Sequence, residues 1–110
     1  MKYEYFKDGQ KRYITMGIHQ RLPPTIQFFL WRMVELMKQN FEADYLQVFN
    51  LEVIGDKEDV SLVQVITHSQ EVPEYERIYY FPVLSGITAT GKIYIMDEGD
   101  HAIMLWADER

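Results

Sequence analysis

The chain has 110 residues, a formal net charge of -6 and no cysteine. One domain with a single hydrophobic core is therefore expected over 1–110, and disulfides, thiolate metal sites and cysteine nucleophiles are excluded. The negative balance argues against a surface that neutralises nucleic-acid phosphates, because such surfaces need clustered lysine and arginine. No stretch has the apolar length of a signal peptide or a membrane span, so we expect a soluble cytoplasmic protein without membrane contacts.

The first third of the chain predicts a strand followed by one long helix. Residues 1–11 are polar with three interleaved aromatics, which fits either a frayed tail or a short edge strand. Residues 12–18 are rich in β-branched and aromatic side chains and predict a strand that ends at Gly17. Two prolines then close the connection, and proline is well placed in a first helical turn because its missing N–H would have no partner there.

The helix is predicted over residues 23–40, beginning at about Pro24 or Thr25. Apolar residues recur there at the spacing i, i+3, i+4, i+7, which places one stripe on a single face. That stripe is predicted to be the core face, and it consists of Ile26, Phe29, Leu30, Met33, Leu36 and Met37. Because everything after Asn40 reads as strand and turn, the stripe is expected to pack on a sheet.

The remainder of the chain predicts strands. Residues 45–54 are predicted to form a central strand, joined by a polar turn at 55–59 to a second strand over 60–67. Residues 70–77 are predicted to be a loop, because Pro73 cannot donate to a ladder, followed by a short strand over 78–81. Ser85 and Gly86 mark another turn.

A final hairpin is predicted from residues 91–96 and 101–107, with its turn at 97–100. Simple alternation would place Ile93 and Ile95 on one face with Ile103 and Leu105. The whole order is β-α-β-β-(β)-β-β. It predicts an α+β fold in which one main helix packs on a mainly antiparallel sheet.

Several phrases of the sequence together resemble the domain of unknown function 960 family, found in Gram-positive bacteria and some of their mobile elements. The phrases are Arg12-Tyr13-Ile14-Thr15, Phe29-Leu30-Trp31, Asp44-Tyr45-Leu46-Gln47-Val48-Phe49, Gln70-Glu71-Val72-Pro73-Glu74-Tyr75 and Asp97-Glu98-Gly99-Asp100-His101. The resemblance extends over nearly the whole chain. It implies a bacterial, cytoplasmic, single-domain protein, and it implies no activity, cofactor or site residue.

Residue types that carry chemistry are present without a recognisable motif. The histidines do not stand in an His-x-x-x-His or His-Glu-x-x-His arrangement, so no metal or other cofactor is expected from local spacing. A metal- or ligand-dependent enzyme remains an alternative if His68, His101 and Asp100 meet in space. The acidic run at 97–101 is better explained as a tight turn, since aspartate and glycine are the residues that turns select.

The main anomaly lies on the helix, where Phe28 and Trp31 are adjacent on the side opposite the core stripe, beside Arg32 and Glu35. Either residues 1–11 or 72–84 of the same chain cover these aromatics, or they form a binding patch with the composition of an interface hot spot. The leading hypothesis is a non-enzymatic module that binds a protein partner or itself through this face.

A third hypothesis is an accessory role in nucleic-acid metabolism of a mobile element. It rests on the aromatic N-terminus together with Lys7, Lys11 and Arg12. The net charge disfavours it.

Overall fold

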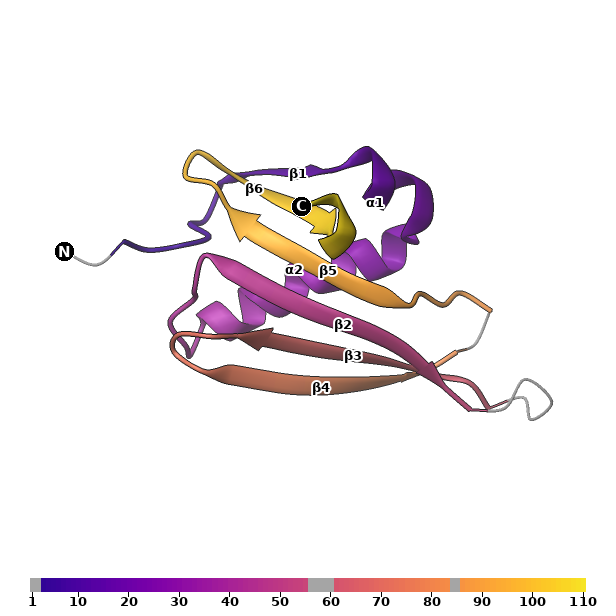
Figure 1. The fold of residues 1–110 in the computed structure, drawn as a ribbon. Helices are drawn as coiled ribbons and strands as arrows, with labels where there is room; N and C mark the ends of the chain where they lie inside the picture. The colour runs from indigo at the N-terminus through magenta and orange to yellow at the C-terminus, as the bar shows by residue number, and fades with distance from the viewer. Residues whose placement is uncertain (1–2, 56–60, 84–85) are drawn as a thin grey trace.

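The structure is a computed structural model that describes residues 3–55, 61–83 and 86–110 (Figure 1). It is a mixed α+β fold with one main helix and a six-stranded sheet of order β1-β6-β5-β2-β3-β4. The elements are β1 (Lys11–Ile14), α1 (Met16–Arg21), α2 (Pro24–Lys38), β2 (Leu46–Ile54), β3 (Val63–Gln70), β4 (Tyr75–Pro82), β5 (Gly91–Asp97), β6 (His101–Trp106) and the 3-10 turn η1 (Ala107–Glu109). Within the described ranges, neither helix has the length and apolarity to cross a membrane.

The sheet is mixed, so the prediction of a mainly antiparallel sheet needs correction. Strand β1 pairs with β6 in parallel, from Lys11 beside His101 to Ile14 beside Met104, while the other neighbours are antiparallel. The parallel pair joins the first strand of the chain to the last. Local patterning cannot reveal such a pair, because two helices and four strands separate the partners in sequence.

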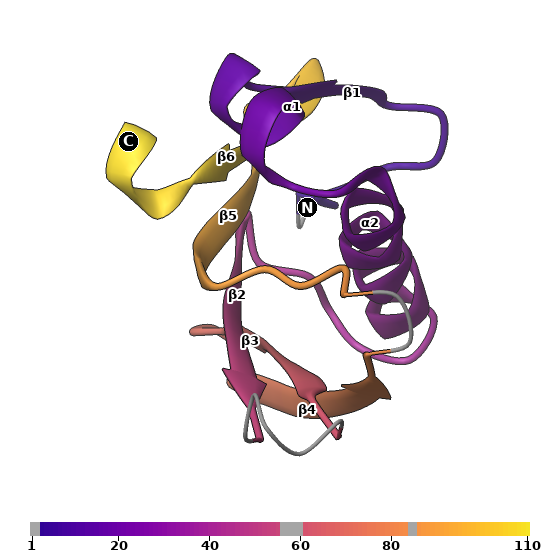
Figure 2. The ribbon, with the colours of Figure 1, turned by 90° about the vertical axis from the view of Figure 1, so that its right-hand side faces the viewer.

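The predicted strand over residues 12–18 is wrong in its second half. The strand ends at Ile14, and Thr15 caps the short helix α1, accepting the Ile18 N–H with its side-chain oxygen at 3.2 Å. A threonine cap satisfies a helix N–H that would otherwise lack a partner, and this local bond competes with continued strand. Figure 2 shows α1 at the β1 edge of the sheet, above the start of α2.

The main helix is confirmed at Pro24–Lys38, but its core face is rotated from the predicted one. Val34 is buried, whereas Leu36 is 41% exposed and Phe29 is only partly buried. The sheet curves around α2, with β1 on one side and β4 on the other (Figure 2). The buried arc of the helix therefore includes the flank that carries Val34, and Leu36 turns outward. Its buried positions are Ile26, Leu30, Met33, Val34 and Met37.

Residues 75–82 form a complete strand, which corrects the predicted loop over 70–77 and the short strand over 78–81. Pro73 lies in the turn before β4, so it takes no ladder position. The buried side chain of Gln70 fixes this turn by donating to the carbonyls of Pro73 (2.7 Å) and Glu42 (2.9 Å). Most of the predicted turn at 55–59, and Ser85, lie outside the described residues.

The final hairpin is confirmed, but its facing residues are not the predicted ones. Asp97 belongs to β5 and pairs with Ala102, so Ile95 lies opposite Met104 and Ile93 opposite Trp106. Ile93 and Ile95 therefore share the helix-facing side with Met104 and Trp106. A shift of one residue in a strand moves its side chains to the other face, and the sequence did not define the length of the turn.

The N-terminal segment is neither frayed nor a strand over residues 3–10. Phe6 is buried in the core, and its N–H donates to the buried carboxylate of Asp97 at 2.7 Å. Asp97 also accepts the N–H of Gly99 at 2.7 Å within the hairpin turn. The acidic turn residue thus joins the N-terminus to the end of β5, and the edge strand β1 begins only at Lys11.

Candidate functional site

The outer face of α2 carries the four residues predicted as a binding patch. Phe28 keeps 76% of its surface exposed, and Arg32 is also exposed. Trp31 and Glu35 are half-buried. Leu36 also turns outward. Because Phe28, Arg32 and Leu36 are spaced four residues apart, they lie along one stripe of the helix.

Arg12 of β1 contacts both half-buried residues of this face. The guanidinium of Arg12 lies 5.0 Å from the centroid of the Trp31 ring and forms an ion pair with Glu35. Trp31 also packs against the core cluster. The alternative in which residues 1–11 or 72–84 cover both aromatics therefore does not describe this face: residue 12 covers Trp31, and Phe28 stays open to solvent.

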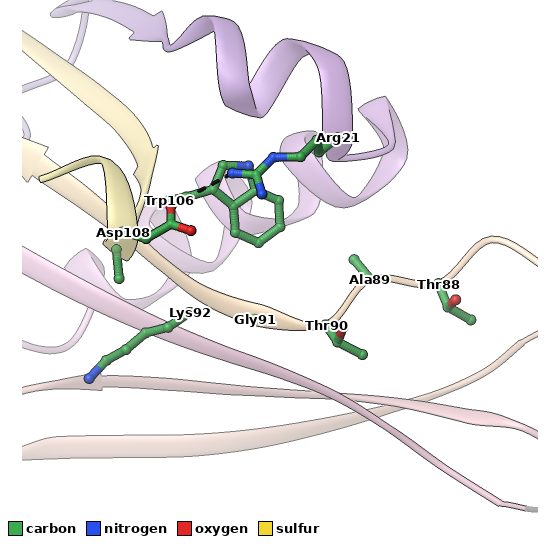
Figure 3. Close-up of a pocket in the computed structure, with 9 residues that line it drawn as sticks. Arg21, Thr88, Ala89, Thr90, Gly91, Lys92, Trp106 and Asp108 are labelled. Carbon is green, nitrogen blue, oxygen red and sulfur yellow. Dashed lines mark ion pairs between the residues drawn. The ribbon is translucent and has the colours of Figure 1, made fainter.

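A second surface feature is a cleft of about 430 Å³ between the end of β6 and the start of β5 (Figure 3). Arg21 lies over the Trp106 ring at 4.7 Å from its centroid and pairs with Asp108 at 3.7 Å. Figure 3 shows the Lys92 side chain extending away from Arg21. The two cations of the cleft do not converge on one point, so the cleft does not have the form of an anion site.

The histidines predicted as an alternative metal or catalytic cluster are not brought together. His68 is fully buried on β3, while His101 begins β6, and strands β2 and β5 lie between them in the sheet. His101 Nδ1 lies 2.7 Å from Asp100 Oδ1, and this hydrogen bond lowers the pKa of the Asp100 carboxyl. Across the described ranges, no three histidine, aspartate or glutamate side chains form a group that could hold a metal ion.

His68 belongs to a buried polar network that sequence reasoning missed. Its Nε2 lies 2.6 Å from the Gln47 side-chain oxygen, and the Gln47 amide donates to Gln70 Oε1 at 2.7 Å and to the Asp44 carbonyl at 2.9 Å. Both glutamine donors are thus used elsewhere, so His68 Nε2 carries the proton of this hydrogen bond. Burial lowers the pKa of His68 to about 4.

A comparable network lies at the other end of the same strand. Gln64 donates to the Ala89 carbonyl at 2.9 Å and accepts the Ala89 N–H at 2.8 Å. The sequence contained a pattern that could have revealed these buried polar side chains. Every second residue of β3 faces the helix, namely Gln64, Ile66, His68 and Gln70. Their inward direction depends on register, which the sequence alone did not settle.

The basic residues near the N-terminus are largely engaged within the chain. The Lys7 ammonium lies 5.3 Å from the centroid of the Tyr3 ring, and Arg12 is paired with Glu35. The ion pair offsets the charge of Arg12, whereas the uncharged Tyr3 ring leaves the charge of Lys7 in place.

Comparison with known proteins identifies the same family that the quoted phrases of the sequence resemble. The family described as "Staphylococcal protein of unknown function (DUF960)" matches residues 11–109. The chain belongs to the DUF960 family. A crystal structure of a protein of unknown function from Enterococcus faecalis superposes on it with a TM-score of 0.76, at 22% identity, covering 99% of this chain and 98% of that one. No curated protein matches the sequence. The DUF960 match shows the family and the Enterococcus structure shows the fold.

Proposed function

We propose that this bacterial protein is a non-catalytic interaction module of the cytoplasm, and that it binds a protein partner through the outer face of α2. The observation that carries the proposal is Phe28, a large apolar side chain in the first half of the main helix with 76% of its surface exposed. A rigid helix presents an aromatic anchor at little entropic cost, and exposed aromatics beside arginine have the composition of interface hot spots.

The surroundings of Phe28 suit a binding surface. The ion pair between Arg12 and Glu35 holds the guanidinium over Trp31, so this side of the face is ordered before a partner arrives. Arg32 and Leu36 extend the stripe by two further turns. The complementary partner surface is an apolar pocket that receives Phe28, with a carboxylate beside it that meets Arg32.

The energetic scale can be set from burial. Complete burial of a phenylalanine side chain is worth about 1.5 to 3 kcal/mol, which corresponds to about a tenfold to hundredfold change in affinity. Removing Phe28 should therefore weaken binding by at least about tenfold. It should leave the stability of the fold nearly unchanged, because surface substitutions away from packed features stay within about 0.5 kcal/mol.

The experiment begins by replacing Phe28 with the photo-crosslinking analogue benzoylphenylalanine and irradiating the protein in a staphylococcal lysate. Met16, an exposed apolar residue on α1, carries the same label in the control. A protein captured only from position 28 is then purified, and its affinity is measured by calorimetry for the wild type, Phe28→Ser, Arg32→Glu and Met16→Ser.

Loss of binding in Phe28→Ser and Arg32→Glu, with full binding by Met16→Ser, supports the proposal. Equal capture from positions 28 and 16 would overturn it, as would a captured partner that binds Phe28→Ser as tightly as the wild type. Trp31 is not a useful test position, because it packs against the core and its removal lowers the stability of the fold.

A further inference from the structure

The outer edge of β4 is the longest exposed sheet edge among the described residues. The sheet ends at β1 on one side and at β4 on the other. Strand β1 has four residues, two of which are Lys11 and Arg12, whereas β4 has eight. Natural proteins protect sheet edges by keeping them short or by placing charge or proline on them. By that rule β1 is protected, whereas β4 has charge only at its start, from Glu76 and Arg77, and proline only at its end, at Pro82, so its middle is unprotected.

The backbone groups that β4 directs outward follow from its pairing with β3. Val83 N–H donates to the Leu62 carbonyl at 2.9 Å, so this pair is a hydrogen-bonded one. Bonded and non-bonded pairs alternate along an antiparallel ladder. In the observed register, Glu76, Ile78 and Tyr80 therefore direct their N–H and carbonyl groups away from β3, toward the open edge.

The side chains at these positions are also accessible. Ile78 is 47% exposed and Tyr80 is 63% exposed, on the side of the sheet that faces away from α2. On the helix side, a hollow of about 490 Å³ lies between the end of α2 and β4, with Phe41, Tyr75 and Arg77 in its wall. The helix thus leaves room at this edge for another strand to approach.

We propose that β4 pairs with β4 of a second copy of this chain, antiparallel about a twofold axis at Ile78, so that two sheets become one continuous sheet. An open edge with unpaired backbone groups accepts a strand, and main-chain hydrogen bonds supply the affinity. The proposed α2 surface is not involved, so this inference stands independently of the proposed function.

The side chains of β4 favour its own copy in one register. With Ile78 on the axis, Glu76 lies opposite Tyr80 of the partner copy and Arg77 opposite Tyr79, so every charge meets an aromatic ring. Centring the axis on Glu76 or Arg77 would place like charges directly opposite, which destabilises a sheet. Shifting it toward Pro82 would pair an outward position with a residue that has no N–H.

The test places a positive or a negative charge at position 78 in two separate variants and measures association by sedimentation velocity. Protein concentrations run from about 1 µM to about 500 µM, because a small interface of this kind gives micromolar affinity. The wild type is expected to dimerise. Ile78→Lys and Ile78→Glu should each be monomeric, since identical charges meet on the axis, and an equimolar mixture of the two should dimerise again. Ile54→Lys is the matched control, because Ile54 is 48% exposed on the same side of the sheet but lies on β2.

A second measurement checks the register. The chain has no cysteine, so Ile78→Cys introduces a single thiol that meets its copy on the axis and should form a disulfide-linked dimer on mild oxidation. Tyr80→Cys, displaced from the axis, should not. A wild type that is monomeric at every concentration would overturn the proposal, and so would an Ile78→Lys variant that dimerises as the wild type does. A mixture that stays monomeric would also overturn it.

Discussion

The buried histidine of β3 makes the stability of this fold depend on pH in a way that can be calculated. Burial lowers the pKa of His68 from 6.5 to about 4. Between these two values the unfolded chain binds a proton at position 68 that the folded chain does not bind. The contribution of His68 to the free energy of unfolding is therefore fully present above pH 6.5. It falls by about 1.4 kcal/mol for each pH unit below that value, down to about pH 4.

The total loss attributable to His68 is about 3 kcal/mol by pH 4. This is a large part of the stability of a small domain, which is typically about 5 to 15 kcal/mol. Arg77 is the register neighbour of His68 on β4, and its charge is constant over this range. Tyr75 packs against the His68 ring with its centroid at 5.3 Å, and burial raises the pKa of Tyr75, so its phenol also stays neutral.

The variant that isolates this effect is His68→Gln. A glutamine at position 68 has an amide donor for the Gln47 side-chain oxygen, but it does not titrate. Urea unfolding of both proteins is measured at closely spaced pH values from about 7.5 to about 4.5, and the free energies of unfolding are subtracted. Carboxylates that titrate in the same range contribute equally to both proteins and cancel in the difference.

The stability advantage of the wild type over His68→Gln should shrink by about 2 to 3 kcal/mol between pH 7 and pH 4.5. A constant penalty from imperfect packing of glutamine would displace the difference curve without changing its slope. Parallel pH profiles for the two proteins would refute the reasoning, because they would show that His68 titrates alike in the folded and unfolded chains.

Three further substitutions test individual contacts by urea unfolding. Gly91→Ala should lower the free energy of unfolding by about 1 to 2 kcal/mol more than Gly99→Ala. Both glycines have positive φ, but only at Gly91 would a Cβ lie 2.9 Å from the Trp106 ring. Equal losses of stability would contradict this reasoning. Asp97→Ala should cost about 1 to 3 kcal/mol and speed amide exchange at the N-terminal segment it anchors, with Asp97→Asn retaining part of both effects. Gln70→Ala should cost about 2 kcal/mol or more, since it removes the hydrogen bonds of a buried side chain to the Pro73 carbonyl and the Gln47 amide, and a neutral result would count against the anchoring role.

Family membership and the strongest local elements could be predicted because their signals are contained in short stretches of sequence. The main helix has a regular apolar period and a proline at its start, and the last hairpin has a turn sequence between two apolar runs. The short helix α1 was missed because its residues have strand propensity, and one threonine cap decides the outcome. Strand β4 was predicted too short because the loop around Pro73 was extended to residue 77, whereas the strand begins at Tyr75.

The candidate surface was predicted in part. The helical period alone placed Phe28 and Arg32 on the outer face. The burial of Trp31 under Arg12 depends on β1 lying beside the last strand of the chain, a parallel pairing between segments about ninety residues apart. Strand order likewise separates His68 from His101: the sequence left both available for one site, but strands β2 and β5 lie between them.

The sequence by itself determined the class of fold, the family, the main helix and the presence of an aromatic on its outer face, because each depends on residue type and spacing along a few turns or one hairpin. The tertiary structure decided which side of each strand is buried, which of the two outer aromatics is partly covered and which sheet edge is open. These properties depend on register and on the order of strands in the sheet. A shift of one residue, or a different neighbour, reverses them without any change in the local pattern.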